Sequence, residues 1–249
     1  MSEWRGRVEH YLRKRIAEEG CIHLTLIDPE KTTGLEQVVR LAENAGTAGF
    51  MVGGSTVASQ REVEAVVDWI RKVSTLPIIL FPNGLAGLAA NADAVFFMSL
   101  FNATNPYFIT GVQALAAPLV KRLGLEPIPL AYLIVEPGGS AAFVGAARSI
   151  PRNHPELAAA FAQAAELLGL RFVYLEAGSG AADPLPPSFV RKVASATQLP
   201  LIVGGGIRTA EHARILATVG ARIIVTGTLA ERSPAALPKI IHAVQTAGQ

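Results

Sequence analysis

One carboxylate in this sequence stands where a general base would be expected. Glu176 follows the hydrophobic run at residues 171–175 and precedes the Ala-Gly-Ser-Gly segment at residues 177–180. A carboxylate at the end of a strand can take the proton from a substrate hydroxyl. Tyr174, two residues earlier, points to the same side of an extended strand and can orient that hydroxyl. The structural alternatives are a salt bridge for Glu176 and core packing for Tyr174.

Three glycine-rich segments are candidates for phosphate binding. Besides residues 177–180, the β-branched runs at 201–203 and 223–226 end at Gly-Gly-Gly (204–206) and Gly-Thr (227–228), ahead of helix-like segments. Free backbone amides and the positive end of a helix dipole together bind phosphate. Eight-stranded α/β barrels commonly build this site after strands seven and eight. We therefore expect these loops to anchor a phosphorylated substrate.

Asp28 and Ser55 form a candidate pair of magnesium ligands. Asp28 directly follows a hydrophobic run at residues 22–27, and Ser55 follows another at residues 49–53. Carboxylate and hydroxyl oxygens suit Mg²⁺, which usually completes its shell with water and substrate phosphate oxygens. Both residues can equally serve as N-caps of the helix-like segments that follow them. Their spacing alone leaves both interpretations open.

Other polar residues point away from several kinds of chemistry. His23 alternates with apolar residues inside its strand and is expected to be a hydrogen-bonded core histidine. The single cysteine, Cys21, excludes an internal disulfide framework and a multi-cysteine metal site. The triple glycine lacks the spacing of a dinucleotide-binding motif. Lys31 is the one lysine that we place on the same rim as Asp28.

The elements that position these residues predict an α/β chain with the (β/α)8 TIM-barrel fold. The 249 residues fit one such barrel, a single domain over residues 1–249. An extra N-terminal helix, residues 4–19, is expected to pack outside the barrel floor. Strands are expected at residues 22–27, 49–53, 77–81, 94–98, 128–135, 171–175, 201–203 and 223–226. The intervening helices are expected at residues 33–45, 60–73, 107–123, 156–168, 187–196, 209–219 and 231–244.

The connection between the third and fourth strands is unusually short. Residues 82–93 contain Pro82, Gly84 and Gly87 and cannot hold two loops and a full helix. The third helix should therefore be shortened or missing. Its absence would leave an open apolar flank on the barrel. By contrast, residues 138–155 form a long rim segment rich in glycine and alanine.

Composition and charge limit the partners and the location. The net charge is +2 and the basic residues are spread out, so no nucleic-acid partner is expected. The least charged stretch, residues 94–120, is interrupted by polar residues, proline and glycine, which argues against a transmembrane helix. The charged N-terminus lacks a secretory segment, so a cytoplasmic enzyme is expected. The apolar residues at 101–119 favour a homo-oligomer, a dimer or higher.

Motifs along nearly the whole chain resemble one family. The sequence is similar to the geranylgeranylglyceryl phosphate synthases, prenyltransferases that attach a polyprenyl chain to sn-glycerol 1-phosphate in archaeal-type ether lipid synthesis. The matching motifs are HLTLIDPEK at 23–31, GGS at 53–55, FP at 81–82, YLEAGSG at 174–180, GGGIR at 204–208 and TGT at 226–228. The chain departs from the family pattern at Asn83, where glycine is expected.

The resemblance implies a TIM barrel with a displaced or absent third helix, and it implies roles for the candidate residues. Asp28 and Ser55 would be the ligands of a Mg²⁺ cofactor. Glu176 would be the general base, with Tyr174 beside it. The donor would be a polyprenyl diphosphate, with geranylgeranyl diphosphate favoured, and the lipid product can associate peripherally with a membrane. Glycerol phosphate would contact Tyr174, Leu175, Glu176, Ala177, Gly178, Ser179, Gly180, Gly204, Gly205, Gly227 and Thr228.

Three alternatives remain beside this function. A related enzyme could transfer the prenyl group to another three-carbon phosphate such as 3-phosphoglycerate, for which an extra cation near Glu176 would be expected. A phosphosugar isomerase, synthase or aldolase on the same barrel would need a second acid or base, or a Schiff-base lysine such as Lys31. A carrier of phospholipid or polyprenyl phosphate would bind without turnover.

Overall fold

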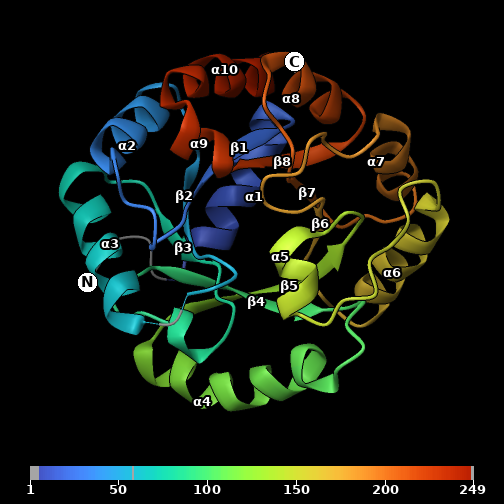
Figure 1. Ribbon diagram of the computed structural model, residues 1–249, viewed down its shortest axis with the longest axis horizontal. Coiled ribbons are helices and arrows are strands. Elements are labelled where there is room, and N and C mark those ends of the chain that lie inside the picture. The colour runs from blue at the N-terminus through green and yellow to red at the C-terminus, as the bar shows by residue number, and fades with distance from the viewer. Residues whose placement is uncertain (1–5, 58, 248–249) are drawn as a thin grey trace.

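Eight parallel strands close into a barrel. The computed structural model describes residues 6–57 and 59–247, and its strands are hydrogen-bonded in the order β1 to β8, with β8 pairing with β1. This confirms the (β/α)8 fold (Figure 1). The strands are β1 (Ile22–Ile27), β2 (Gly49–Val52), β3 (Ile78–Leu80), β4 (Ala94–Leu100), β5 (Glu126–Ile134), β6 (Phe172–Glu176), β7 (Leu201–Gly204) and β8 (Ala221–Thr226).

The outer helices surround the strands as a ring in Figure 1. They are α2 (Leu35–Asn44), α3 (Gln60–Val73), α4 (Val112–Leu123), α6 (Pro155–Leu167), α7 (Pro187–Ala194), α8 (Ala210–Thr218) and α10 (Leu237–Ala247). Strand residues alternate between two apolar layers, so Leu24 and Val225 fill the barrel while Ile27 and Ile224 pack under the helices. Burial on both faces explains why the strands are nearly continuous apolar runs. None of the helices in the described part of the chain is long and apolar enough to cross a bilayer.

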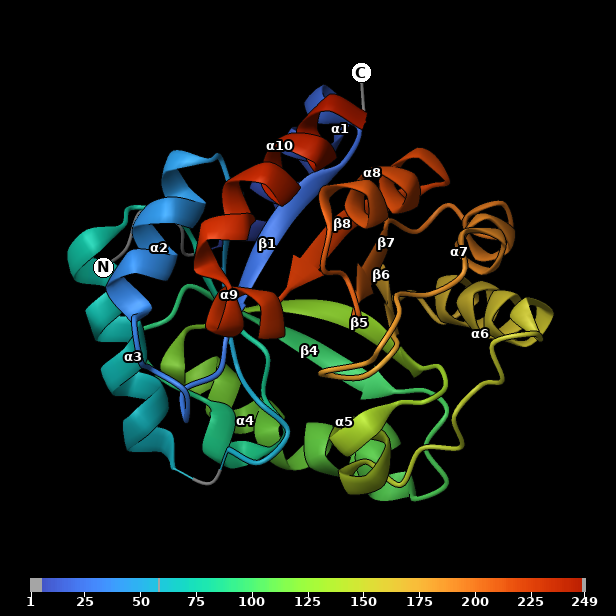
Figure 2. The same ribbon diagram turned by 45° about the horizontal axis from the view of Figure 1, so that its top comes forward.

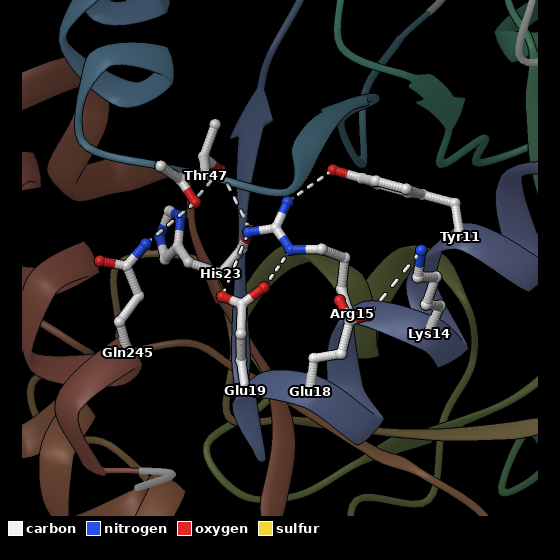
Figure 3. Close-up of polar contacts among 9 residues, drawn as sticks. Tyr11, Lys14, Arg15, Glu18, Glu19, His23, Thr47 and Gln245 are labelled. Atoms are coloured by element: carbon white, nitrogen blue, oxygen red, sulfur yellow. Dashed lines mark hydrogen bonds and ion pairs between the residues drawn. The ribbon is translucent and has the colours of Figure 1, made fainter.

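The N-terminal helix α1 (Val8–Glu19) closes the barrel floor, as expected from its spacing, although Trp4 and Arg5 of the predicted helix lie outside the described residues. Val8 and Leu12 are fully buried against the inner layer. The Glu126 carboxylate of β5 accepts hydrogen bonds from the amides of Val8 (2.7 Å) and Glu9 (3.0 Å). It therefore satisfies two of the free amides at the start of α1. Figure 3 shows Lys14 reaching toward Glu18 on this helix.

The third helix is reduced to one 3₁₀ turn, as the short connection predicts. This turn, η1 (Leu85–Gly87), is followed by an irregular segment with a turn at residues 90–91 that leads into β4. The segment ends at Asp93, whose buried carboxylate accepts the amide of Ile78 at 2.8 Å and pairs with Arg71 at 2.9 Å. The connection is therefore anchored to β3 and α3 without a helix of its own.

Three segments differ from the sequence-based prediction. A short helix, α5 (Gly139–Val144), forms inside the rim segment, and α4 is preceded by a π-helical turn, η2 (Tyr107–Gly111). The last predicted helix, residues 231–244, is wrong in its start and its continuity. It begins earlier as α9 (Thr228–Arg232), breaks at Ser233, and resumes through η3 (Pro234–Ala236) into α10. Pro234 explains the break, because proline disfavours the helical conformation in the residue before it.

His23 is a buried structural histidine, as predicted. Its Nδ1 lies 3.0 Å from Thr47 Oγ1 and its Nε2 lies 2.9 Å from Thr226 Oγ1, which joins β1 to β8 (Figure 3 shows the contact with Thr47). Burial disfavours the imidazolium and lowers the pKa of His23 from 6.5 to about 3. The ring is therefore neutral at physiological pH.

This histidine should make stability depend on pH. The unfolded chain binds a proton at His23 near pH 6.5, whereas the folded protein does so only near pH 3. The unfolding free energy should therefore decrease as the pH falls through this window, by about 1.4 kcal/mol per pH unit from this group. Urea unfolding between pH 7 and pH 4 should show this slope in the wild type and a shallower one in His23→Asn. Equal slopes would show that His23 does not cause it.

Candidate active site

Glu176 lies buried at the carboxyl end of β6 among neutral hydrogen-bond donors. Its Oε1 accepts the amide of Gly178 at 2.6 Å, and the hydroxyls of Tyr174 and Tyr132 also donate to the carboxylate. Two tyrosines from neighbouring strands thus converge on one carboxylate. The salt bridge considered as an alternative is not the observed arrangement, because all three of these partners are uncharged.

The pKa of Glu176 is raised to about 7, mainly because burial disfavours its charged form. The hydrogen bonds from Gly178, Tyr174 and Tyr132 oppose this shift. The pKa values of both tyrosines are raised well above 10 by burial and by the nearby carboxylate, so their hydroxyls remain protonated donors. A carboxylate with a near-neutral pKa is well matched to general base catalysis.

An aromatic cluster beneath Glu176 holds these tyrosines in place. Phe81, which follows β3, stacks on Tyr174 with ring centroids 5.3 Å apart and packs edge-on against Tyr132, also at 5.3 Å. The two tyrosine rings are themselves edge-to-face at 5.2 Å. Tyr174 therefore packs in the barrel interior, as the core-packing interpretation predicts, and its hydroxyl contacts the Glu176 carboxylate. Its role in orienting a substrate hydroxyl stays a prediction.

The three glycine-rich loops converge beside Glu176. Ser179 Oγ lies 3.2 Å from Thr228 Oγ1, which connects the loops after β6 and β8. Gly205 has a φ of +86°, and a Cβ placed on it would lie 2.6 Å from Glu176 Oε1, so glycine is needed there for both reasons. A cavity of about 340 Å³ opens between the loops. Its polar rim is formed by Ser179, Gly180, Gly205, Gly206, Arg208, Thr226, Gly227, Thr228, Arg232 and Ser233.

Four residues of the expected glycerol-phosphate set do not line this cavity. The side chains of Leu175 and Ala177 point into the outer apolar layer, and the Ala177 amide already donates to the Gly204 carbonyl at 3.1 Å. Gly204 packs against the Tyr174 hydroxyl. The Gly178 amide is bound to Glu176. The structure therefore brings Ser179, Gly180, Gly205, Gly227 and Thr228 to the cavity together with Tyr174 and Glu176.

The capping roles considered for Asp28 and Ser55 are excluded. Helix α2 begins after Gly34 without a side-chain cap, and α3 is capped by Ser59, whose Oγ accepts the Glu62 amide. Asp28 instead accepts the Glu30 amide through Oδ1 at 3.1 Å and the Lys31 ammonium through Oδ2 at 2.9 Å. The Ser55 hydroxyl lies 3.2 Å from that of Ser140 on α5.

The surroundings of Asp28 and Ser55 fit a divalent cation that binds together with an anionic substrate. Both line one cavity, and a Cβ on the adjacent Gly54 would lie 2.8 Å from Asp28 Oδ1, so glycine leaves the carboxylate its space. Within the described residues no group of three or more His, Cys, Asp or Glu side chains forms a metal cluster. A cation here would take much of its shell from water and phosphate oxygens, as Mg²⁺ commonly does.

This second cavity, of about 240 Å³, is mostly apolar and extends from Asp28 along β4 to α4. The shortened third connection opens it, since Pro82, Gly84 and Leu88 form one wall where a helix would otherwise pack. The remaining apolar wall comes from Phe81, Val95, Phe96, Phe97, Met98, Phe108, Val112 and Ala116. Asn83 donates from Nδ2 to the carbonyls of Ser55 (3.1 Å) and Val57 (3.0 Å), so this departure from the family pattern fastens the loop that carries Ser55.

Three contributors to the site were missed by sequence reasoning. Tyr132 had a signal, because it stands at an inward position of an expected strand next to the strand of Glu176. Ser140 lies in the rim segment, where no helix was predicted. Glu231 was predicted as the first residue of the last helix and was given no role in the site, yet its Oε2 lies 3.4 Å from Lys31 Nζ. Figure 2 shows the two helices that carry the last two residues: α9 lies near the lower end of β1, and α5 lies below β4 and β5 in this view.

The fold and its rim define a (β/α)8 barrel whose sixth, seventh and eighth strands lead into one glycine-lined cavity. Solved barrels such as thiamine phosphate pyrophosphorylase from Pyrococcus furiosus (17% identity, TM-score 0.57) and the tryptophan synthase alpha chain from Legionella pneumophila (16%, 0.60) share this fold alone. The chain belongs to the PcrB family, whose profile matches residues 14–247.

Three relatives that align over nearly the whole chain are geranylgeranylglyceryl phosphate synthases by name. The geranylgeranylglyceryl phosphate synthase of Pyrococcus abyssi is 52% identical over 228 residues, 91% of this chain and 90% of the relative. That of Methanothermobacter marburgensis is 49% identical over 245 residues, 97% and 99% of the two chains. A crystal structure of (S)-3-O-geranylgeranylglyceryl phosphate synthase from Thermoplasma acidophilum in complex with substrate sn-glycerol-1-phosphate has 39% identity, a TM-score of 0.91 and 99% coverage of both chains.

The hydrogen bond from Tyr132 should set the pKa of Glu176. Because this bond favours the carboxylate, Tyr132→Phe should raise the pKa of Glu176 above about 7. Tracking the Glu176 carboxyl carbon by ¹³C NMR during a pH titration measures the shift. Tyr107→Phe removes a hydroxyl elsewhere on the rim and is the matched control. An unchanged pKa in Tyr132→Phe would show that this hydroxyl does not support the charged form.

Proposed function

We propose that this protein is a Mg²⁺-dependent prenyltransferase that joins a polyprenyl chain to sn-glycerol 1-phosphate through an ether bond. The donor is a polyprenyl diphosphate, with geranylgeranyl diphosphate favoured, and the reaction releases diphosphate in archaeal-type ether lipid synthesis. The observation that carries the proposal is that Glu176 lines both cavities. A carboxylate with a pKa of about 7 thus lies where the apolar donor cavity meets the glycine-lined acceptor cavity. The shared name of relatives at about half identity supports it.

The acceptor binds in the glycine-lined cavity. Its phosphate is held by the loops of Ser179, Gly205 and Thr228, with the Arg208 and Arg232 guanidinium groups at the rim adding positive charge. The free hydroxyl then faces Glu176, whose carboxylate takes its proton. The resulting nucleophilic oxygen forms a bond to the first carbon of the prenyl chain. Fixing both reactants in adjoining cavities supplies much of the rate enhancement through proximity.

The donor binds with its chain in the apolar cavity and its diphosphate near Asp28. Aromatic and aliphatic side chains line the part of the cavity proposed for the chain, and polar side chains line the part near Asp28. Asp28 and Ser55 would hold Mg²⁺, which would neutralise charge on the leaving diphosphate and so favour cleavage of the carbon–oxygen bond.

The structure weakens the aldolase alternative. A Schiff-base lysine needs a lowered pKa so that the neutral amine can attack a carbonyl. The pKa of Lys31 is instead raised, first by its bond to Asp28 and further by Glu231. Lys31 therefore remains an ammonium ion. Transfer to 3-phosphoglycerate would use the same site with a different acceptor. Turnover with competing acceptors distinguishes this reaction from transfer to sn-glycerol 1-phosphate.

We place the enzyme in the cytoplasm and propose that it forms a homo-oligomer. The single cysteine, Cys21, is buried and its pKa is raised to about 12, which suits a reduced structural thiol. Leu115 on α4 is 59% exposed, Phe143 on α5 is 90% exposed and Leu167 on α6 is 88% exposed. Large exposed apolar patches are typical of surfaces that a partner covers, and we propose that these side chains belong to such a surface. A monomer mass in light scattering would exclude the oligomer.

Turnover with defined substrates tests the proposed reaction. With Mg²⁺, radiolabelled sn-glycerol 1-phosphate and prenyl diphosphates of increasing length, we expect an ether product with one preferred length, and loss of product when EDTA removes the cation. The sn-3 enantiomer and 3-phosphoglycerate serve as competing acceptors. A folded protein that makes no product with any donor would favour the isomerase or carrier alternatives.

Glu176→Gln tests the base directly. The amide cannot accept the proton, so kcat should decrease by about 10²-fold or more while the Kd for glycerol phosphate changes little. In the wild type, activity should fall as the pH drops below about 7, because the carboxylate becomes protonated. Single-turnover kinetics and calorimetric binding measure the two effects separately. Unchanged turnover in Glu176→Gln would exclude this residue as the base.

A further inference from the structure

Lys31 bridges two carboxylates at the polar end of the donor cavity. Its Nζ lies 2.9 Å from Asp28 Oδ2 and 3.4 Å from Glu231 Oε2. Asp28 comes from the loop after β1 and Glu231 from α9, so the lysine connects segments two hundred residues apart in the chain. All three residues line the same cavity as Ser55 and Thr56. Glu30, the other carboxylate on this loop, accepts the Thr56 hydroxyl instead, at 2.6 Å.

Both oxygens of Asp28 are already occupied in this arrangement. Oδ1 accepts the amide of Glu30 at 3.1 Å, and Oδ2 is paired with Lys31. A divalent cation that approaches Asp28 therefore meets an ammonium ion at the oxygen it would bind. Two like charges on one carboxylate oxygen repel, so binding of the cation and release of Lys31 are linked.

The displaced ammonium has a place to go within the same cavity. Lys31 is half-exposed on a flexible side chain of four methylene groups, so it can swing without moving the backbone. A diphosphate near Asp28 brings several negative charges within reach of that side chain. Charge-assisted hydrogen bonds to phosphate oxygens are stronger than those to neutral acceptors. The lysine would thus exchange a carboxylate partner for a phosphate partner.

We propose that Lys31 is a placeholder for the divalent cation: its ammonium bridges Asp28 and Glu231 before the cation binds, and it pairs with the diphosphate when cation and donor bind. The inference rests on the proposed function, because it takes Asp28 as a cation ligand and diphosphate as the leaving group. Lys31 then has two opposite effects. It weakens binding of the cation alone and strengthens binding of the diphosphate.

Substitution of Lys31 should change the affinity for the cation alone and the affinity for the diphosphate in opposite directions. In Lys31→Met, Mn²⁺ added alone should bind about three to ten times more tightly, because two carboxylates lose their competing ammonium. In the presence of saturating Mg²⁺, inorganic pyrophosphate should bind about tenfold more weakly, because its cationic partner is gone. Electron paramagnetic resonance of free Mn²⁺ and titration calorimetry with pyrophosphate measure the two affinities without turnover.

Two further variants control for charge and folding. Lys31→Arg keeps the positive charge and should restore both affinities toward the wild-type values. Lys14→Met removes a comparable exposed ammonium, paired with Glu18 at 3.8 Å on the barrel floor, and should change neither (Figure 3). Circular dichroism confirms that each variant is folded.

The outcomes distinguish the placeholder from an ordinary ion pair. Tighter Mn²⁺ binding together with weaker pyrophosphate binding in Lys31→Met would support the proposal. An unchanged or weaker Mn²⁺ affinity, or an unchanged pyrophosphate affinity, would overturn the role of Lys31 while leaving the prenyltransferase function standing. A wild-type protein that binds neither Mn²⁺ nor pyrophosphate and makes no ether product would overturn the proposed function as well.

Discussion

The burial of the Glu176 carboxylate among three neutral donors is the interaction on which the rest of the site depends. Burial alone would drive the carboxyl group to its protonated form, and charged donors would make it too weak a base. Two tyrosine hydroxyls and one amide leave its pKa near 7, between these limits. This balance requires β5 and β6 to deliver Tyr132 and Tyr174 side by side, with Phe81 packed against both rings. The aromatic residues inside the barrel therefore position the hydroxyls that tune the pKa of Glu176 at the rim.

The closed barrel also explains why two different cavities meet at this carboxylate. Parallel strands direct all their carboxyl ends to one rim, so polar loops gather there. On one side the loops after β6, β7 and β8 are rich in glycine and approach one another closely enough to enclose a polar cavity. On the other side the missing third helix opens an apolar cavity between η1 and α4. A site that joins a phosphate to a long apolar chain needs both, and the barrel supplies them without an inserted domain.

Polar contacts at the rim also join loops that are remote in sequence. Lys31 contacts one carboxylate from its own loop and another from α9, at the opposite end of the chain. Ser55 on the loop after β2 meets Ser140 on α5, which extends from the loop after β5. Such contacts tie the loops together across the opening. They also place charged side chains at the polar end of the apolar cavity.

The sequence by itself determined the barrel, the reduced third connection, the three glycine-rich loops and the strand-end positions of Asp28, Ser55 and Glu176. These depend on local signals: β-branched runs, glycine at strand ends, and a connection too short for a helix. Only the tertiary structure decided that Asp28 and Ser55 are not helix caps, that Tyr132 completes the environment of Glu176, and that Lys31 bridges to Glu231. Pro234 divides the predicted last helix into α9 and α10, and α5 forms in a rim segment whose sequence has no helical periodicity. The physical reason is that side-chain partners and pKa values depend on distances between strands and loops remote in sequence, which closure of the barrel sets and local patterns do not encode.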